Sequence, residues 1–351
     1  MCLKLTFDQA NRRIACTFAT ALHDVPRRQT TQERGLSIYT ITGGAGFIGS
    51  HLADALLAAG HHVRVLDDFS TGRPENLDSR CEVMRGDICD PGLVRRAMLG
   101  AAGCFHLAAI ASVARANEDW LGTHRVNLGG TITVLDAARH LGGVPVVYAS
   151  SAAVYGRLDG VAAEDSATAP LTAYGADKRA SELHAAAGTL VHDVPTLGFR
   201  FFNIYGPRQD PTSPYSGVIS IFARLIAAGQ TVTVNGDGRQ TRDLIFVGDI
   251  VRFLTAGMDR LTAGGHGVSG TVLNACTGRE TSVLDMARLI GELIGTEVRM
   301  RHGPPRPGDI PRSVGSPARA AARLGVAAQT GLREGLAATL AGLHGRTSLA
   351  A

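Results

Sequence analysis

The chain has 351 residues, of which 45% are hydrophobic and 19% charged, and its formal net charge is +4. This is the composition of a globular protein that is long enough for one large α/β domain and a smaller lobe. Its arginines are spread along the chain and no apolar run reaches the roughly 18 residues that span a bilayer. We therefore expect neither nucleic acid nor a membrane as a partner.

The cysteines are too scattered to suggest a metal site. They form no C-x-x-C pair and no cluster with histidine. They are Cys2, Cys16, Cys81, Cys89, Cys104 and Cys276. We predict no metal site, and reduced thiols in a cytoplasmic protein.

Residues 1–36 differ from the rest of the chain. They contain two pairs of arginines, no continuous apolar segment and little periodicity, so they do not resemble a secretory signal. We interpret them as a poorly ordered extension or as the result of a start codon assigned too early. Nothing in their composition supports a targeting role.

The first regular segment begins at Ser37. The apolar "SIYTI" is followed by "TGGAGFIGSHLADALLAAG", which predicts a strand, a glycine turn and a helix. Gly43, Gly46 and Gly49 lack a Cβ, so the backbone can turn tightly and approach a pyrophosphate. The free N–H groups at the start of the helix would bind its oxygens. A merely structural glycine turn is the alternative, but the strand before and the helix after favour the phosphate site.

A second strand, "HHVRVLD", ends at Asp67, about 20 residues beyond the glycines. A carboxylate there can accept hydrogen bonds from the adenosine ribose hydroxyls and repels a 2′-phosphate. The cofactor should therefore be NAD rather than NADP. Asp68 could be a solvated acid, and we favour Asp67 because it closes the strand.

Strand-like and helical segments then alternate. The strand-like segments are "CEVMRGDI", "GCFHLAA", "VPVVYAS", "VPTLGFRFFN" and "RDLIFV". This alternation predicts an α/β fold with a doubly wound, mostly parallel sheet of the Rossmann type. Asp87 could meet the adenine amino group, and the small residues after His106 would let a cofactor lie close. A histidine such as His106 is more often structural than catalytic.

The segment "YASSAAVYG" lies at the carboxyl edge of the predicted sheet, where ligands bind in such folds. On the next helix, Tyr174 and Lys178 stand at positions i and i+4 and so share a face. Alone, this spacing is a weak signal, but with a serine it forms a site for hydride transfer at a secondary alcohol. We expect Lys178 and the positive nicotinamide ring to lower the pKa of the Tyr174 phenol so that it acts as a base.

Nine motifs together resemble the extended short-chain dehydrogenase/reductases, in particular the nucleotide-sugar 4-epimerases. The resemblance covers about residues 37–340. The motifs are "TGGAGFIGSH", "LDDFSTG", "GDI", "HLAA", "SSAAVYG", "YGADK", "RFFNIYGPRQDP", "NGDGRQTRD" and "RPGD", in the family's order.

The resemblance implies three sets of site residues. The catalytic set is Ser151, Tyr174 and Lys178, with Ser150 as the less favoured serine. The cofactor would be contacted by Gly43, Gly46, Phe47, Ile48, Gly49, Asp67, Asp87, Ile88, Leu107, Ala108, Ala109, Asn127, Tyr174, Lys178 and Phe202. The substrate would be contacted by Ser151, Asn203, Val218, Asn235, Arg242, Arg306, Asp309 and Ser313. Arg242 and Arg306 would hold the diphosphate, because planar bidentate donors suit phosphate oxygens.

The resemblance also bears on the reaction. Family dehydratases carry an Asp-Glu pair where this chain has Ala152 and Ala153, and the glutamate of the sugar-acid decarboxylases is missing too. The residues that are present, a tyrosine base, a serine and an NAD site, imply NAD-dependent C4 epimerisation of a UDP-hexose through a transient 4-keto sugar. A small Ser313 would admit UDP-GlcNAc and UDP-GalNAc as well as UDP-glucose and UDP-galactose, unless it is only an exposed loop serine. A UDP-uronate epimerase, a dehydratase, a reductase and a non-catalytic NAD-binding protein remain alternatives.

We predict two domains from these segments. Residues 37–203 with about 241–262 would form the NAD-binding domain, whose sheet would include a strand from "RDLIFV". About 204–240 and 265–340 would form a discontinuous substrate lobe, with a helix at 282–295 capped by Ser282. The family resemblance implies a homodimer formed through helices at about 90–140 and 170–192. We expect residues 344–351 to be loose.

Overall fold

The computed structural model describes residues 36–210, 218–305 and 310–347. The predictions for residues 1–35, Arg306 and Asp309 lie outside the described residues.

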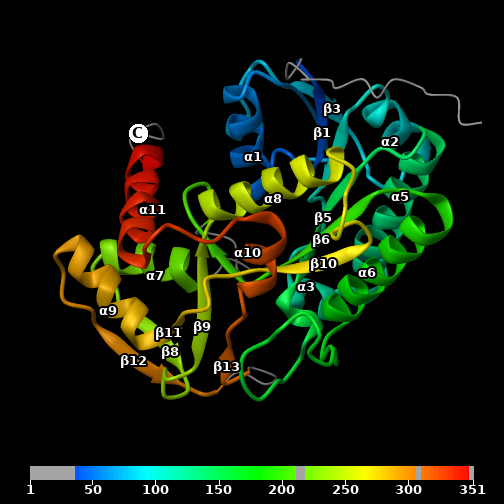
Figure 1. Cartoon of the computed structure of the whole chain (residues 1–351). Coiled ribbons are helices and arrows are strands. Elements are labelled where there is room, and N and C mark those ends of the chain that lie inside the picture. Colours follow the sequence, from blue (N-terminus) through cyan, green and yellow to red (C-terminus); the bar gives the residue numbers. More distant parts are fainter. Residues whose placement is uncertain (1–35, 211–217, 306–309, 348–351) are drawn as a thin grey trace, which may run out of the picture. The chain divides into compact units, whose positions relative to one another are not determined.

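A seven-stranded parallel sheet organises the larger part of the chain (Figure 1), in the order β10-β6-β5-β4-β1-β2-β3. Its strands are β1 Ile38–Thr42, β2 His62–Asp67, β3 Glu82–Arg85, β4 Gly103–His106, β5 Val146–Ser151, β6 Thr196–Phe201 and β10 Thr271–Ala275. The direction of winding reverses between β1 and β4, and in open α/β sheets this switch point opens the ligand crevice. The predicted doubly wound fold is confirmed.

Helices cover both faces of this sheet. They are α1 Phe47–Ala58, α2 Pro91–Met98, α3 Val113–Glu118, α4 Trp120–His124, a π-helical turn Arg125–Gly129, α5 Gly130–His140, α6 Ala173–His192 and α8 Val247–Thr262. Short 3₁₀ turns lie at Pro74–Asn76 and Ala152–Val154. Strands β1, β4 and β6 are buried on both sides, which explains their largely apolar sequences, whereas the edge strand β3 is mostly exposed.

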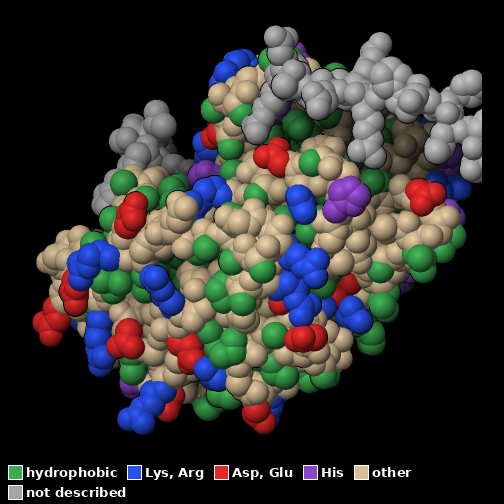
Figure 2. Space-filling model, viewed as in Figure 1, with side chains coloured by type: hydrophobic (Ala, Val, Ile, Leu, Met, Phe, Trp, Pro, Cys, Tyr) green, Lys and Arg blue, Asp and Glu red, His purple; other side chains and the backbone are tan. Residues whose placement is uncertain are grey.

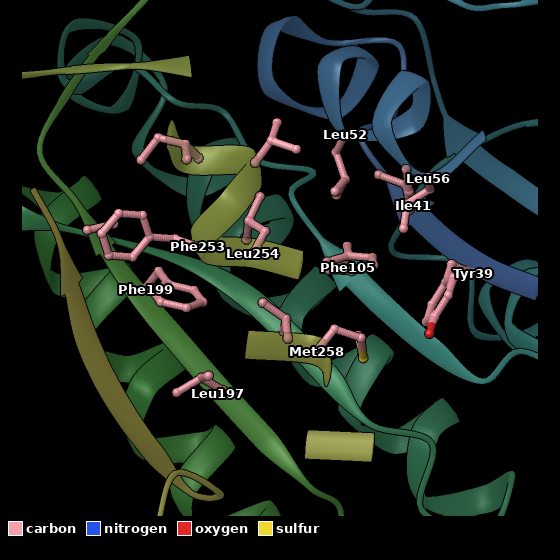
Figure 3. Close-up of a cluster of buried hydrophobic side chains, with 14 of the residues drawn as sticks. Tyr39, Ile41, Leu52, Leu56, Phe105, Leu197, Phe199, Phe253, Leu254 and Met258 are labelled. Atoms are coloured by element: carbon pink, nitrogen blue, oxygen red, sulfur yellow. The ribbon is translucent and has the colours of Figure 1, made fainter. Parts of the chain in front are cut away.

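Each face of the sheet has its own hydrophobic core. On one face, α1 and α8 contact each other and pack on the strands, with Leu52 and Phe253 among the fully buried side chains (Figure 3). On the other face, α2, α5 and α6 contribute Val94, Val134 and Ala185. Because both faces are packed, the ends of the strands are left as the place for a ligand.

The smaller lobe is built from two further sheets. Its strands are β7 Asn203–Tyr205, β8 Val232–Asn235, β9 Thr241–Phe246, β11 Glu280–Ser282, β12 Met300–Gly303 and β13 Arg312–Ser313. Strand β9 pairs with β7, β11 and β13, and β8 pairs with β12. The remaining helices of the described residues are α7 Val218–Ala227, α9 Val283–Ile294, α10 Ala318–Leu324 and α11 Leu332–Thr347.

Three expectations about these segments were wrong. The "RDLIFV" strand, β9, lies in the small sheet, and the seventh strand of the main sheet is β10, which we had assigned to the lobe. Short apolar strands look alike in sequence, and only their pairing partners distinguish them. Helix α11 also continues to Thr347, so residues 344–347 are helical rather than loose. The predicted helix α9 is confirmed, with the Ser282 hydroxyl accepting a hydrogen bond from the Asp285 N–H at 3.0 Å.

On the face drawn in Figure 2, acidic and basic side chains are interspersed. No helix within the described ranges is long and apolar enough to cross a membrane.

Candidate active site

A cavity of about 580 Å³ lies at the carboxyl ends of the main sheet's strands. The predicted site residues on its wall are Gly43, Gly46, Phe47, Ile48, Gly49, Asp67, Asp87, Ile88, Leu107, Ala108, Ala109, Ser151, Tyr174, Lys178 and Phe202. Segments that are far apart in sequence thus meet at one place, as parallel strand ends must.

The glycine turn is shaped by close backbone approaches. Gly43 has φ +70°, and a Cβ on it would lie 2.7 Å from the Ala108 nitrogen. A Cβ on Gly49 would lie 2.3 Å from the Gly43 carbonyl oxygen. Side chains at these positions would fill the space between β1, α1 and the loop after β4. Because Gly43 and Gly49 have no side chains, they leave a cradle at the start of α1 that fits the pyrophosphate of a dinucleotide.

Asp67 is buried at the end of β2 and lines the cavity. Its carboxylate accepts hydrogen bonds from the N–H groups of Ala45 and Phe69, both at 2.9 Å. Burial raises the pKa of Asp67 above its usual range, while these two hydrogen bonds act against the rise. Asp68 lines the cavity as well, and its carboxylate accepts from the Ser70 N–H at 2.8 Å.

Asn127 does not line the cavity, although it was expected near the cofactor. It is buried behind the wall and exchanges two hydrogen bonds with Ile110, a residue of the wall. Its Oδ1 accepts from the Ile110 N–H at 2.8 Å and its Nδ2 donates to the Ile110 carbonyl at 3.2 Å. Asn127 therefore fixes the loop after β4.

Asp87, which follows β3, lines the cavity and accepts hydrogen bonds from the Cys89 N–H and the Arg125 guanidinium. Burial alone would raise the pKa of Asp87, but these partners hold it below its ordinary value.

The three catalytic candidates meet where β5 and α6 approach each other. Helix α6 begins after Thr172, whose hydroxyl accepts a hydrogen bond from the Gly175 N–H at 3.1 Å. Ser151 stands close enough to Tyr174 to act on the pKa of its phenol, and the Ser151 hydroxyl accepts a hydrogen bond from the Ala153 N–H at 3.1 Å. The Lys178 ammonium donates to the Ala149 carbonyl at 2.9 Å and lies 5.9 Å from the centre of the Tyr174 ring.

The protein's own groups raise the pKa of the Tyr174 phenol, and the prediction that Lys178 and the positive nicotinamide ring together lower it concerns the cofactor-bound site. Burial raises this pKa, and only the hydrogen bond with Ser151 acts against the rise. The ammonium is directed to the Ala149 carbonyl, and burial lowers its own pKa to about 8 despite the nearby Asp177 carboxylate. The positive ring of oxidised NAD would act with the Lys178 ammonium to favour the phenolate.

The predicted substrate residues in the described ranges, other than Ser151, lie outside the wall of this cavity. Arg242 and Ser313 are paired neighbours on β9 and β13. The Arg242 guanidinium donates to the carbonyls of Thr241 at 2.8 Å and Ile310 at 2.9 Å. Asn203 is exposed on β7, while Val218 begins α7 and Asn235 ends β8.

The sequence prediction missed several residues of the site. Arg115 and Gln209 line the cavity; no local pattern singles out Arg115, whereas Gln209 lies within the quoted motif "RFFNIYGPRQDP" without having been selected. Glu182 and Arg200 form a buried ion pair directly behind it. The position of Glu182, four residues after Lys178, was an available signal because it places the carboxylate on the catalytic face of α6.

Comparisons with known proteins agree with this geometry. A family model described as the NAD dependent epimerase/dehydratase family matches residues 39–275. A UDP-glucose 4-epimerase of Mycolicibacterium smegmatis is 39% identical over 308 residues, which is 86% of this chain and 96% of the relative. A dTDP-glucose 4,6-dehydratase of Streptomyces griseus is 35% identical over 317 residues, covering 87% and 93%. The crystal structure of the UDP-glucose 4-epimerase of Thermotoga maritima with UDP-glucose superposes with a TM-score of 0.83 at 31% identity, covering 89% and 99%.

Proposed function

The chain belongs to the NAD-dependent epimerase/dehydratase family, and we propose that it interconverts the C4 epimers of a UDP-hexose through a transient 4-keto sugar. The observation that carries the proposal is the meeting of Ser151, Tyr174 and Lys178 on the wall of one cavity, with two alanines after the serine.

The residues after Ser151 favour an epimerase over a dehydratase. Elimination of water from a sugar needs an acid and a base beside the carbons that react. Ala152 and Ala153 begin a short 3₁₀ turn and supply neither group. Among the described residues of the wall, the carboxylates are Asp67, Asp68 and Asp87, which follow β2 and β3 rather than β5.

Each catalytic residue has a role that its contacts support. Bound NAD would supply the acceptor, and then the donor, of the hydride at C4. Tyr174 takes the proton of the C4 hydroxyl, and the nearby Ser151 hydroxyl holds the same oxygen. Lys178 remains near the phenol and, by the family resemblance, holds the nicotinamide ribose.

Epimerisation also requires the keto-sugar to turn over inside the site. Contacts to the hexose must then be weak, while the nucleotide diphosphate is held firmly. We assign the second task to Arg242, the described member of the predicted arginine pair. Its guanidinium is already oriented by the Ile310 carbonyl, which limits the freedom that it would lose on binding.

Ser313 is the residue that we propose sets substrate size. It is half-buried and pairs in register with Arg242, so it stands beside the proposed diphosphate site. Ser313→Tyr should abolish turnover of UDP-GlcNAc and UDP-GalNAc and spare the plain hexoses, whereas Ser313→Ala should keep both. Equal loss of both activities in the tyrosine variant would show that position 313 does not select the sugar.

The proposed reaction is tested by NMR of the purified protein with UDP-GlcNAc, and separately with UDP-glucose, without added NAD. We expect the C4 epimer from at least one substrate. Tyr174→Phe should bind UDP-sugar but lose turnover, and full activity of this variant would refute the mechanism. If the wild-type protein converts neither substrate even with NAD added, the dehydratase, reductase and UDP-uronate reactions become the candidates.

We also propose that the protein is a homodimer. Four large apolar side chains are exposed on α5 and α6: Ile132, Leu183, Leu190 and Val191. Large apolar side chains exposed on two neighbouring helices favour an interface, and a two-fold dimer is the commonest assembly. Leu190→Arg should give a monomer in size-exclusion chromatography.

A reducing compartment suits the four described cysteines, which are all free thiols, and we propose that the protein works in the cytoplasm.

A further inference from the structure

A buried ion pair joins the catalytic helix to the central strands. Glu182 on α6 and Arg200 on β6 each have side chains that are only 2% exposed. The Arg200 Nε and Nη2 atoms donate to the two carboxylate oxygens of Glu182, both at 2.8 Å. The Ser150 hydroxyl donates to Glu182 at 2.6 Å, and Arg179 donates at 2.8 Å. The carboxylate is therefore fully hydrogen-bonded.

The partners of this pair stand next to the proposed catalytic residues. Glu182 lies four residues after Lys178 and eight after Tyr174, on the same face of α6. Ser150 precedes Ser151 and pairs in register with Arg200 across β5 and β6. The pair thus joins the helix that carries the tyrosine to the strand that carries the serine.

Arg200 is also held from its other side. Its guanidinium carbon lies 4.7 Å from the centre of the Tyr155 ring, and its Nη1 donates to the Glu164 carbonyl at 3.2 Å. Tyr155 in turn donates to the Asn274 side chain on β10 at 2.7 Å. The position of the guanidinium is therefore determined by contacts from several directions.

A buried ion pair of this kind contributes more to the relative position of the helix and the strand than to the stability of the fold. Burying two charges costs hydration that their attraction often fails to repay, so apolar replacements of similar volume are frequently neutral or stabilising. Directional hydrogen bonds, however, hold a helix at one position along a strand more strictly than apolar contacts do. Burial alone would raise the pKa of Glu182, but its partners keep it below its ordinary value, so the carboxylate stays ionised.

We propose that Glu182 and Arg200 are positioning residues that set the spacing between Ser151 and the Tyr174–Lys178 pair. This inference rests on the proposed catalytic roles of those three residues. A displacement of about 1 Å at a reacting group can lower the rate about 10²-fold. The pair should therefore matter for turnover much more than for folding or binding.

The test is the double variant Glu182→Leu with Arg200→Met, which leaves no buried charge unpaired. We expect a urea midpoint close to that of the wild-type protein, a KM for UDP-sugar within about twofold, and a kcat lower by about 10²-fold. Met258→Ala serves as the control, because it destabilises the other core without touching the cavity and should keep kcat. A stable double variant with wild-type kcat would overturn the proposal.

Two further measurements cover the remaining cases. If the double variant does not fold, Glu182→Gln keeps the shape of the side chain and removes its charge. Its kcat should fall at least tenfold at constant KM, and a wild-type kcat would again contradict the proposal.

If the wild-type protein turns over no UDP-sugar, the proposed function fails independently of this pair. A crystal structure of whichever variant folds then decides, because an unchanged spacing between Ser151 and the Tyr174–Lys178 pair would rule out the positioning role.

Discussion

Replacing Gly49 by alanine tests the phosphate cradle directly. The added Cβ would lie 2.3 Å from the Gly43 carbonyl oxygen and 2.7 Å from the Gly44 Cα. Both are backbone atoms, so no side-chain rotation can relieve the contact. Restoring an ordinary contact requires the start of α1 to move about 1 Å away from the turn, and overpacking of this kind costs about 1–3 kcal/mol.

The same movement should weaken the binding of NAD. The N–H groups at the start of α1 would be displaced from the pyrophosphate oxygens, and a hydrogen bond to a charged group contributes about 1.5–3 kcal/mol. The loss of one such bond corresponds to a Kd raised by about 10- to 100-fold. Calorimetric titration of NAD into protein freed of cofactor measures the change in Kd, and urea unfolding measures the stability.

Gly129→Ala is the matched control for this experiment. A Cβ there meets nothing within 4 Å, and Gly129 has φ −58° at the end of the π-helical turn. The variant should be more stable by about 0.5–1 kcal/mol and should bind NAD normally. Wild-type NAD affinity and an unchanged urea midpoint in Gly49→Ala would refute the reasoning.

Three other changes have definite expected outcomes. Asp67→Asn removes the charge that repels a 2′-phosphate, so the ratio of NADP to NAD affinity should rise at least about tenfold in calorimetric titration. Burial lowers the pKa of His106 to about 3, so below pH 6.5 the unfolded chain binds a proton that the folded protein does not. Stability should consequently fall by up to about 1.4 kcal/mol per pH unit as pH drops from 6.5 towards 3, and urea unfolding of His106→Asn at pH 7 and 5.5 should show a smaller loss. Thr172→Ala removes the cap of α6 and should cost about 1 kcal/mol in urea unfolding, and an unchanged midpoint would mean that the cap is dispensable.

The parts of the site that could be predicted from the sequence depend on short-range spacing. The glycines of the first turn, Asp67 at the end of a strand, and Tyr174 with Lys178 on one helix face are all set by local geometry. The structure brings each of them to one cavity because parallel strands end at the same edge.

The parts that could not be predicted depend on pairing between distant segments. We assigned β9 and β10 to the wrong sheets. The sheet to which each strand belongs depends on its pairing partners, and sequence periodicity does not identify them. The role of Asn127 comes from Ile110 on another loop, and the Glu182–Arg200 pair needs a helix and a strand to be docked first. The burial of Tyr174 and the direction of the Lys178 side chain, towards the Ala149 carbonyl, also follow from tertiary packing.

Strand β10 is translated long after its neighbour β6, and this order affects folding during synthesis. Strand β6 ends at Phe201, and its neighbour β10 is Thr271–Ala275, so the lobe elements from β7 to β9 are translated in between (Figure 1). During synthesis one edge of β6 stays unpaired until the ribosome has released Ala275. Unpaired strand edges are templates for aggregation. We therefore expect ribosome-bound chains that stop between β9 and β10 to be the species most in need of a chaperone.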